Sequence, residues 1–368
     1  MFLCTLLIAG CNDKEQTSQQ NTSKTYPKNP AIAEKFETVI VRPEGTDAPK
    51  GSEAFKTENP YINPLTGLAT SVDLTNKRPV AVMINNIHQA LPQVGISEAD
   101  IVYEILEEGG ITRLLCIYND YESIPEIGSV RSARDYYIDI ADAHDAIYVH
   151  AGGSTYAKER LAQLGTNNLD GLYLNAFYRS DERRKTMSKE HTLMISGQGI
   201  NDSIALKNYR TTSDNPCPLV FEDEPTTFGQ STAYHIEVPF DMGNKPDPYA
   251  VSYFDYDYDN KVYLKGQYKQ EHIDGDDGSQ LSFKNVVTLI CDMNVIPGDT
   301  LGCIQVHFVG QGRGTYSVNG TIREIAWKKP SRTEPYTLYE KDGTTPLLLS
   351  AGKTYIGIVP AGTKLSVD

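Results

Sequence analysis

Apolar residues change their periodicity near residue 215, and this change constrains the fold more than any other feature. Before it, short apolar runs at 79–84, 101–106 and 146–150 alternate with helix-like segments. After it, short strand-like segments follow one another with almost no helical periodicity. A chain of 368 residues also exceeds what one hydrophobic core usually covers. We therefore predict an α+β protein of two domains, with an α/β domain over residues 60–215 and a β-rich domain, a sandwich or a partly closed barrel, over 216–368.

The N-terminus carries a short apolar run that ends in small residues and a cysteine. Ile8, Ala9 and Gly10 precede Cys11, and polar residues follow at once. This pattern resembles a bacterial lipobox, whose cysteine receives a diacylglycerol thioether and becomes the mature N-terminus. No Lys or Arg precedes the run, which we interpret as a true start upstream of Met1. The sequence thus predicts a signal peptide at 1–11 and a lipid anchor on Cys11, with the protein on the extracytoplasmic face of the cell membrane.

Residues 12–59 are rich in Lys, Glu, Thr, Ser, Gln, Asn and Pro, with one apolar cluster at 39–41. Such a composition cannot bury enough apolar surface to fold and indicates a flexible tether. A coil of about 45 residues spans on the order of 35–40 Å. We expect this segment to be a spacer between the membrane and the folded part.

Composition excludes several classes of protein. The net charge of −14 argues against a nucleic-acid partner, since phosphate binding requires clustered Lys and Arg. No later run reaches the roughly 18 apolar residues that a membrane helix requires. The cysteines beyond the signal show neither a disulfide framework nor zinc spacing, and they are Cys116, Cys217, Cys291 and Cys303. A Cys291–Cys303 disulfide and two unlinked core thiols both stay open, and we predict no metal and no cofactor.

Two arginines stand at the entrance of a predicted helix. Ser132 and Asp135 form a capping-box pattern that opens a helix running to about Ala143. Arg131 and Arg134 lie beside its first turn, where the helix dipole and unpaired N–H groups are already positive. Two guanidinium groups there require negative charge nearby.

That negative charge has two candidate sources. Glu104, Glu107 or Glu108 could fold over and pair with the arginines internally. Alternatively, a phosphate or carboxylate ligand could bind to both arginines and the helix N–H groups. Arg113, in the same window, adds a third cation to this expected site.

A glycine-rich loop follows the predicted strand at 146–150. His150, Gly152, Gly153 and Ser154 occupy the strand-to-helix turn where ligands collect in α/β sheets. The glycines allow close approach of a ligand, and His150 could donate a proton or a hydrogen bond. A tight turn with Ser154 as helix cap explains the same residues without a ligand.

Basic residues also precede His191, another candidate for the ligand site. This cluster could bind a polyanion, but interleaved acids favour a solvated mixed surface. Its members are Arg179, Arg183, Arg184, Lys185 and Lys189, and the acids are Asp181, Glu182 and Glu190.

The acidic and glycine-rich motifs of the second half predict structure more than chemistry. Alternating Asp and Tyr at 255–260 fit a strand with acids toward water, since the spacing fails the calcium-loop template. Asp274, Asp276 and Asp277 form an acidic loop for which a metal is the less favoured interpretation. The glycines at 310–314 precede no helix, which argues against a phosphate loop.

Many motifs occur together in one order: the lipobox, the polar tether, NPLTGL, RPVAVMINN, ADIVYE with EGGITR, GSVRSAR, HAGGS and HIDGDDGSQLSFKNVV. In this order the chain resembles the YerB-like lipoproteins of bacteria over residues 60–360. The resemblance implies two domains of unknown function and attachment to the cell surface. It supplies no catalytic residues, and Glu190 stands before His191 where family members usually have Pro.

Three functions remain as hypotheses. The first is a lipid-anchored envelope protein whose α/β domain binds an anionic envelope molecule through Arg131 and Arg134. The second is an enzyme acting on a cell-wall glycan, peptide or phosphate ester, with Glu107 or Glu108 and His150 as acid and base. The third is a protein–protein interaction module that uses the acidic β surface.

Overall fold

The computed structural model describes residues 59–213, 217–223, 229, 231–242 and 251–368. The predicted signal peptide, lipidated Cys11 and tether lie outside the described residues. The described residues belong to one compact unit. Within the described ranges, every helix is too short or too polar to cross a membrane.

The elements of the N-terminal half alternate strands with helices, as the sequence predicts. The strands are β1 (Tyr61–Ile62), β2 (Ala69–Thr70), β3 (Val80–Asn85), β4 (Ile101–Leu106), β5 (Thr112–Tyr118), β6 (Ile127–Gly128), β7 (Ile147–His150), β8 (Asn168–Asp170), β9 (Tyr178–Arg179) and β10 (Leu193–Ile195). The α-helices are α3 (Asp135–Ala143), α4 (Thr155–Leu164) and α5 (Gly197–Leu206).

The C-terminal half is built from strands in its described part. They are β11 (Phe221–Glu222), β12 (Ser231–Thr232), β13 (His235–Pro239), β14 (Val251–Asp257), β15 (Val262–Gln267), β16 (Gln270–Glu271), β17 (Ser282–Phe283), β18 (Asn285–Val295), β19 (Ile304–His307), β20 (Gly310–Val318), β21 (Thr321–Lys329), β22 (Thr337–Glu340), β23 (Leu349–Ser350), β24 (Thr354–Pro360) and β25 (Ser366–Val367). This half therefore has the β-rich texture that its sequence predicts.

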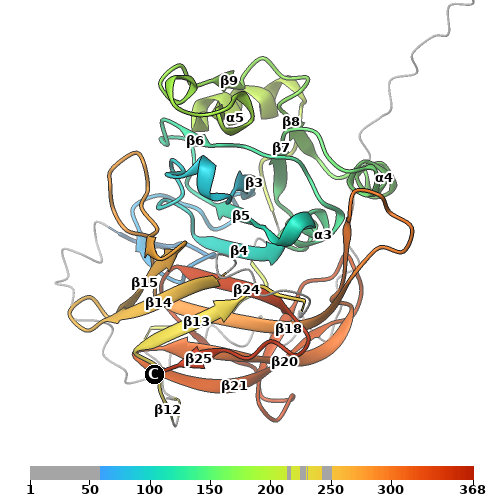
Figure 1. Ribbon diagram of the computed structural model, residues 1–368. Helices are drawn as coiled ribbons and strands as arrows, with labels where there is room; N and C mark the ends of the chain where they lie inside the picture. Colours follow the sequence, from blue (N-terminus) through green and yellow to red (C-terminus); the bar gives the residue numbers. More distant parts are fainter. Residues whose placement is uncertain (1–58, 214–216, 224–228, 230, 243–250) are drawn as a thin grey trace, which may run out of the picture. The chain divides into compact units, whose positions relative to one another are not determined.

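One large sheet runs through both halves in the order β12-β21-β20-β18-β24-β4-β5-β3-β7-β8. The halves meet where β24 pairs in parallel with β4, in a register from Thr354↔Ile101 to Ile358↔Ile105 (Figure 1). The predicted boundary near residue 215 falls at residues outside the described ranges, and it stays a prediction. Strands from either side of it share one continuous hydrogen-bonded ladder.

The central strands are buried on both faces. Val82 and Cys116 belong to one core, while Met83 and Leu115, each one residue away in its strand, belong to the other. This alternation follows from the two-residue period of a strand, and two covered faces explain why these strands read as unbroken apolar runs. Helix α3 covers the face that carries Met83. A second sheet, in the order β16-β15-β14-β13-β25, forms a separate layer.

Local signals located several turns correctly. The hairpin between β4 and β5 turns at Gly109 and Gly110, whose φ angles of 74° and 76° favour glycine. Helix α4 begins after Ser154, whose side chain accepts from the amide of Ala157, and ends at Gly165 with φ 61°. Both features confirm the predictions.

Other expectations were wrong or stayed open. Helix α3 begins at Asp135 and has Arg134, not the predicted Ser132, at its N-cap position. Arg134 makes no side-chain cap hydrogen bond, so the predicted capping box does not form. Cys291 and Cys303, left open as a disulfide, are both free thiols. The glycines at 310–314 lie in strand β20, which agrees with the rejection of a phosphate loop.

A buried guanidinium and carboxylate site

The candidate site lies at one edge of the large sheet, where several parallel strands end. Strands β3, β7 and β8 are parallel and end at Asn85, His150 and Asp170. Strand β5 is antiparallel to β3, so Arg113 near its start lies at the same edge, opposite Asn85. The carboxyl edge of an α/β sheet is where ligands usually bind.

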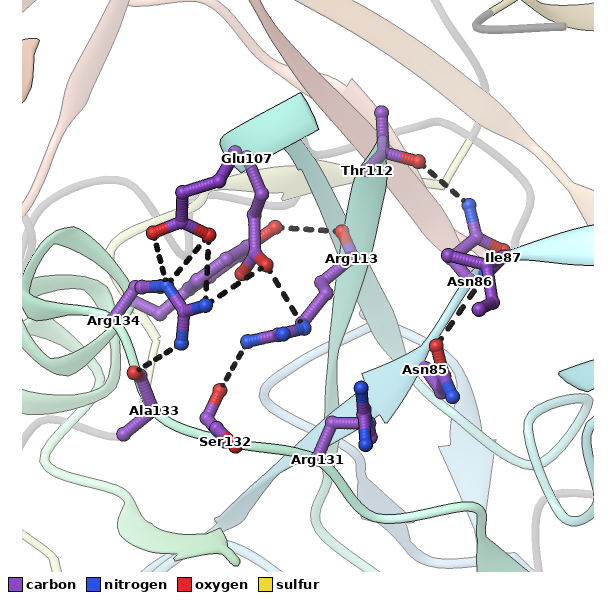
Figure 2. Close-up of polar contacts among 12 residues, drawn as sticks. Asn85, Asn86, Ile87, Glu107, Thr112, Arg113, Arg131, Ser132, Ala133 and Arg134 are labelled. Atoms are coloured by element: carbon purple, nitrogen blue, oxygen red, sulfur yellow. Dashed lines mark hydrogen bonds and ion pairs between the residues drawn. The ribbon is translucent and has the colours of Figure 1, made fainter. Parts of the chain in front are cut away.

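Arg134 and Glu108 form a bidentate ion pair at the start of α3. Nε of Arg134 lies 2.8 and 3.1 Å from the two Glu108 oxygens, and Nη2 lies 2.7 Å from Oε2 (Figure 2). Burial alone would raise the pKa of Glu108, but the Arg134 bonds outweigh it and the pKa is lowered. Arg134 is thus neutralised internally, as one of the two sequence alternatives proposed.

Glu107 is fully buried between two arginines. Its Oε2 lies 2.9 Å from Nε of Arg113 and 3.7 Å from Nη2 of Arg134. Burial raises the pKa of Glu107, and the two guanidinium groups oppose that rise. Arg113 also donates from Nη1 to the carbonyl oxygen of Ser132, at 2.6 Å, which holds the chain just before α3. The pair therefore positions the helix entrance.

Arg131 differs from its neighbours because neither Glu107 nor Glu108 pairs with it. Its ion pair is a 3.7 Å contact with Glu190, a side chain that is 59% exposed, and its Nη1 donates to the Glu190 carbonyl at 3.3 Å. Its Nε is buried and has no hydrogen-bond partner among the described residues. In Figure 2 Arg131 lies near Asn85, with no dashed contact to the residues drawn.

Both guanidinium groups and carboxylates surround Arg131. Burial lowers its pKa, and repulsion from Arg113 lowers it further, while Glu190 acts in the opposite direction. His191 is buried beside it, and its Nδ1 lies 2.9 Å from the side-chain nitrogen of Asn85. Burial lowers the pKa of His191, and the arginines nearby contribute in the same sense. His191 thus lies at this site, whereas several of the basic residues that precede it in the sequence lie elsewhere.

Those basic residues have other roles. Arg183 is buried and donates to three backbone carbonyls, those of Ala90, Pro92 and His191. Arg184 and Lys185 form exposed pairs with acids three residues earlier. The mixed-surface interpretation describes these two residues well.

The predicted glycine loop is present, but His150 is engaged internally. Nδ1 of His150 lies 2.7 Å from the carbonyl oxygen of Gly152, and Nε2 lies 3.1 Å from the side-chain oxygen of Asn168. The amide of Gly152 in turn donates to Asp170 at 2.8 Å, and Ala133 pairs with Gly153. The loop therefore joins β7 and β8 to the start of α3, and Ser154 caps α4.

Glu104 lies on the opposite face of the sheet from the arginines, within a network that joins the two halves. One carboxylate oxygen accepts from Asn86 at 3.1 Å and Thr112 at 2.7 Å. The other accepts from Ser252 and Tyr355, each at 2.8 Å, and lies 3.4 Å from Nζ of Lys265. All of these groups are buried or nearly so, which indicates a structural role for Glu104.

Sequence reasoning identified Glu104 alone in this network, and the ionisable members that it missed are Lys265 and His272. Nζ of Lys265 lies 3.2 Å from Nδ1 of His272, and because an ammonium only donates, Nδ1 accepts. Nε2 of His272 then donates to Gln93, at 2.8 Å. Burial, followed by the Lys265 charge, lowers the pKa of His272 well below its usual value. A charged residue inside an otherwise apolar strand, as at Lys265, was the available signal.

The acidic loop of the second half also connects the halves. Asp274 is buried, and its carboxylate accepts from the amides of Gly95 at 3.0 Å, Ser97 at 2.7 Å and Asp276 at 2.9 Å. These bonds occupy both oxygens. Asp274 therefore serves as a backbone clamp between the N-terminal and C-terminal halves.

The arrangement at the arginines can hold an anion more readily than it can move a proton. Glu107 and Glu108 are committed to ion pairs, and both nitrogens of His150 face protein acceptors. Arg131, by contrast, retains donor capacity toward a ligand. Glu107, Glu108 and His150 therefore form no free acid–base pair in this geometry. The catalytic roles suggested for them stay predictions.

Comparison with known proteins places the chain in a family. Residues 65–210 match the N-terminal domain, and residues 240–356 the C-terminal domain, of a protein of unknown function, DUF3048. The chain is 32% identical over 303 residues to a Bacillus subtilis (strain 168) protein named "Putative lipoprotein YerB", covering 81% of this chain and 86% of that protein. The crystal structure of Bacillus subtilis YerB superimposes with a TM-score of 0.73 at 30% identity, covering 83% of this chain and 99% of that one. The two matched domains and the shared fold show that this chain belongs to the YerB-like DUF3048 family.

Proposed function

We propose that this protein is a lipid-anchored lipoprotein of the bacterial cell envelope, held on the extracytoplasmic face of the membrane, that binds an anionic envelope molecule at Arg131. The lipobox-like sequence before Cys11 and the lipoprotein name of the Bacillus subtilis relative support the anchor. A diacylglycerol on Cys11 would supply the membrane association.

One observation carries the binding proposal: Arg131 is only weakly neutralised within the protein. Glu107 and Glu108 neutralise Arg113 and Arg134, whereas the counter-charge of Arg131 is Glu190, 3.7 Å away on an exposed side chain. Arg131 is the member left without either carboxylate, and its buried Nε lacks a partner. A phosphate or carboxylate at Arg131 would satisfy that donor and replace the exposed Glu190 as its counter-charge.

The lowered pKa of Arg131 and of His191 supports the same conclusion. Burial is the first cause of both shifts and neighbouring arginines add to it, so positive charge is disfavoured at this position. An anionic ligand would reverse this penalty, so its binding energy would include relief of the repulsion between Arg131 and Arg113.

Binding can be tested by thermal denaturation of the full-length protein with inorganic phosphate, pyrophosphate and a glycerol-phosphate oligomer. A ligand at a hundred times its Kd should stabilise the fold by about 2.7 kcal/mol. The stabilisation should disappear in Arg131→Ala and persist in Arg184→Ala, which removes an exposed arginine paired only with Asp181 in the described structure. A shift that survives in Arg131→Ala would refute the site.

A further inference from the structure

The second sheet presents an outward face with an unusual cross-strand row. Glu237 of β13 is paired with Tyr253 of β14, which is paired with Gly266 of β15, which is paired with Glu271 of β16. Alternate residues of the same strands, such as Ile236, Phe254 and Tyr263, are buried in the core. By the two-residue period of strands, the row therefore faces away from the core.

Tyr253 lies flat across Gly266. A Cβ atom added to Gly266 would fall 2.0 and 2.1 Å from Cε2 and Cζ of the tyrosine ring, so the ring occupies the place of the missing side chain. One ring face thus rests on the backbone of β15, and Tyr253 as a whole is only partly buried. Glycine weakens the interior of a strand. Its presence at position 266 is explained by the space that the Tyr253 ring occupies.

A second ring extends this flat surface. The imidazole of His235 is centred 6.1 Å from the Tyr253 ring and inclined to it by only 30°. Its Nδ1 lies 2.6 Å from the carboxylate of Asp255, which holds the imidazole in place. We call this pair of rings, which lie close together at a shallow angle on the outer face of the second sheet, the ring platform. Figure 1 shows the strands β13, β14 and β15 that form this sheet.

Carboxylates surround the platform. Glu237 and Asp255 have side chains that are 50% and 55% exposed, and Glu271 is exposed at the far end of the row. Three carboxylates against one imidazole make this face acidic, the opposite of the site around Arg131. An anionic polymer would be repelled here, whereas hydroxyl and ammonium donors would find acceptors.

We propose that this acidic ring platform, defined by His235, Glu237, Tyr253, Asp255 and Glu271, binds a glycan whose sugars carry free amino groups. The C–H face of a sugar ring carries slight positive charge and stacks on the negative face of an aromatic ring. An ammonium group on that sugar adds a cation–π attraction to Tyr253 and an ion pair with Glu237 or Glu271. The platform thus matches both the shape and the charge of an amino sugar, and it is independent of the anion site proposed above.

Isothermal titration of the full-length protein with a tetramer of β-1,4-linked glucosamine tests this directly. Tyr253→Ala should weaken binding roughly tenfold or more, because it removes both the stacking surface and the cation–π contact. Tyr253→Phe should retain binding, since the ring remains. Tyr258→Ala is the matched control, because that tyrosine is 61% exposed and lies outside the platform.

A second variant keeps the test valid if Tyr253→Ala unfolds the protein. Glu237→Gln changes only an exposed side chain, and it should weaken the binding of the glucosamine tetramer severalfold. The fully N-acetylated tetramer should bind less tightly than the glucosamine tetramer, because it lacks the ammonium groups.

Three outcomes would overturn the proposal: no binding of the glucosamine tetramer, equal affinity for the N-acetylated tetramer, or unchanged affinity in both Tyr253→Ala and Glu237→Gln. If tetralysine bound more tightly than the glucosamine tetramer, and if Tyr253→Ala weakened that binding, the face would bind a basic peptide instead. Arg131→Ala should leave glucosamine binding unchanged, which separates this test from that of the anion site.

Discussion

The carboxylate of Glu107 lies 2.9 Å from Nε of Arg113, and both side chains are almost completely withdrawn from solvent. This pair ties the end of β4 to the start of β5 and, through the Arg113 bond to the Ser132 carbonyl, to the entrance of α3. The arginine that remains outside this pairing is Arg131. Arg113 and Arg134 are thus neutralised internally, whereas Arg131 is the arginine at which we propose a ligand.

We predict that Arg113→Met lowers the free energy of unfolding by about 3–5 kcal/mol, because it leaves a buried carboxylate with only the more distant Arg134. The double variant Arg113→Met with Glu107→Gln should recover part of this loss, since the uncompensated charge is gone. Urea denaturation of the two single variants and the double variant measures the coupling. Additive losses would contradict a direct interaction.

Arg134→Ala and Arg131→Ala should differ in stability although they lie three residues apart. Arg134→Ala removes a bidentate partner from the partly buried Glu108 and should cost about 2–3 kcal/mol. Arg131→Ala should cost less than about 1 kcal/mol without ligand, because its ion-pair partner Glu190 is exposed. Thermal denaturation of both variants decides this, and equal losses would mean that Arg131 also has a structural role.

Lys329 should give the protein a distinctive dependence on alkaline pH. It is buried, lies about 5.3 and 5.2 Å from the ring centres of Phe308 and Tyr336, and donates to the carbonyls of Arg332 and Glu334. Burial lowers the pKa of Lys329 to about 8 from 10.5. Between these values the unfolded chain binds more protons than the folded one, so stability contributed by this group rises with pH there and is constant below about 8.

The comparison of wild type with Lys329→Met isolates this contribution from other titrating groups. The stability difference between them should shift in favour of wild type by about 3 kcal/mol from pH 8 to pH 10.5. Urea denaturation at intervals of half a pH unit provides the measurement. A difference that stays flat with pH would show that Lys329 titrates near its ordinary pKa.

Gly314→Ala should destabilise the protein by about 1–3 kcal/mol through steric overlap. A Cβ at this position would fall 2.2 Å from the carbonyl oxygen of Thr288 in the neighbouring strand β18. Arg313→Ala, at an exposed position beside it, should have little effect. If Gly314→Ala instead kept full stability, close strand packing would not explain the glycine.

The elements with local causes were predictable. Helix α4 could be placed because Ser154 and Gly165 act on backbone groups within a few residues of themselves. The β4–β5 hairpin followed from Gly109 and Gly110 in the same way. Helix α3 begins two residues later than predicted, because the backbone of Ala133 pairs with Gly153 instead of entering the helix.

The candidate site was predictable as a set of residues but not as a set of contacts. Its window of arginines and carboxylates is evident in the sequence, yet Glu104 joins Lys265 on the other face of the sheet, while Glu107 and Glu108 join the arginines. Adjacent strand residues point to opposite faces, so a shift of one residue in register exchanges their partners. The sequence by itself therefore determined the strands, the local turns and the excess of charge at the helix entrance. Only the tertiary structure decided which charges neutralise one another, because that depends on strand register and on contacts between distant segments.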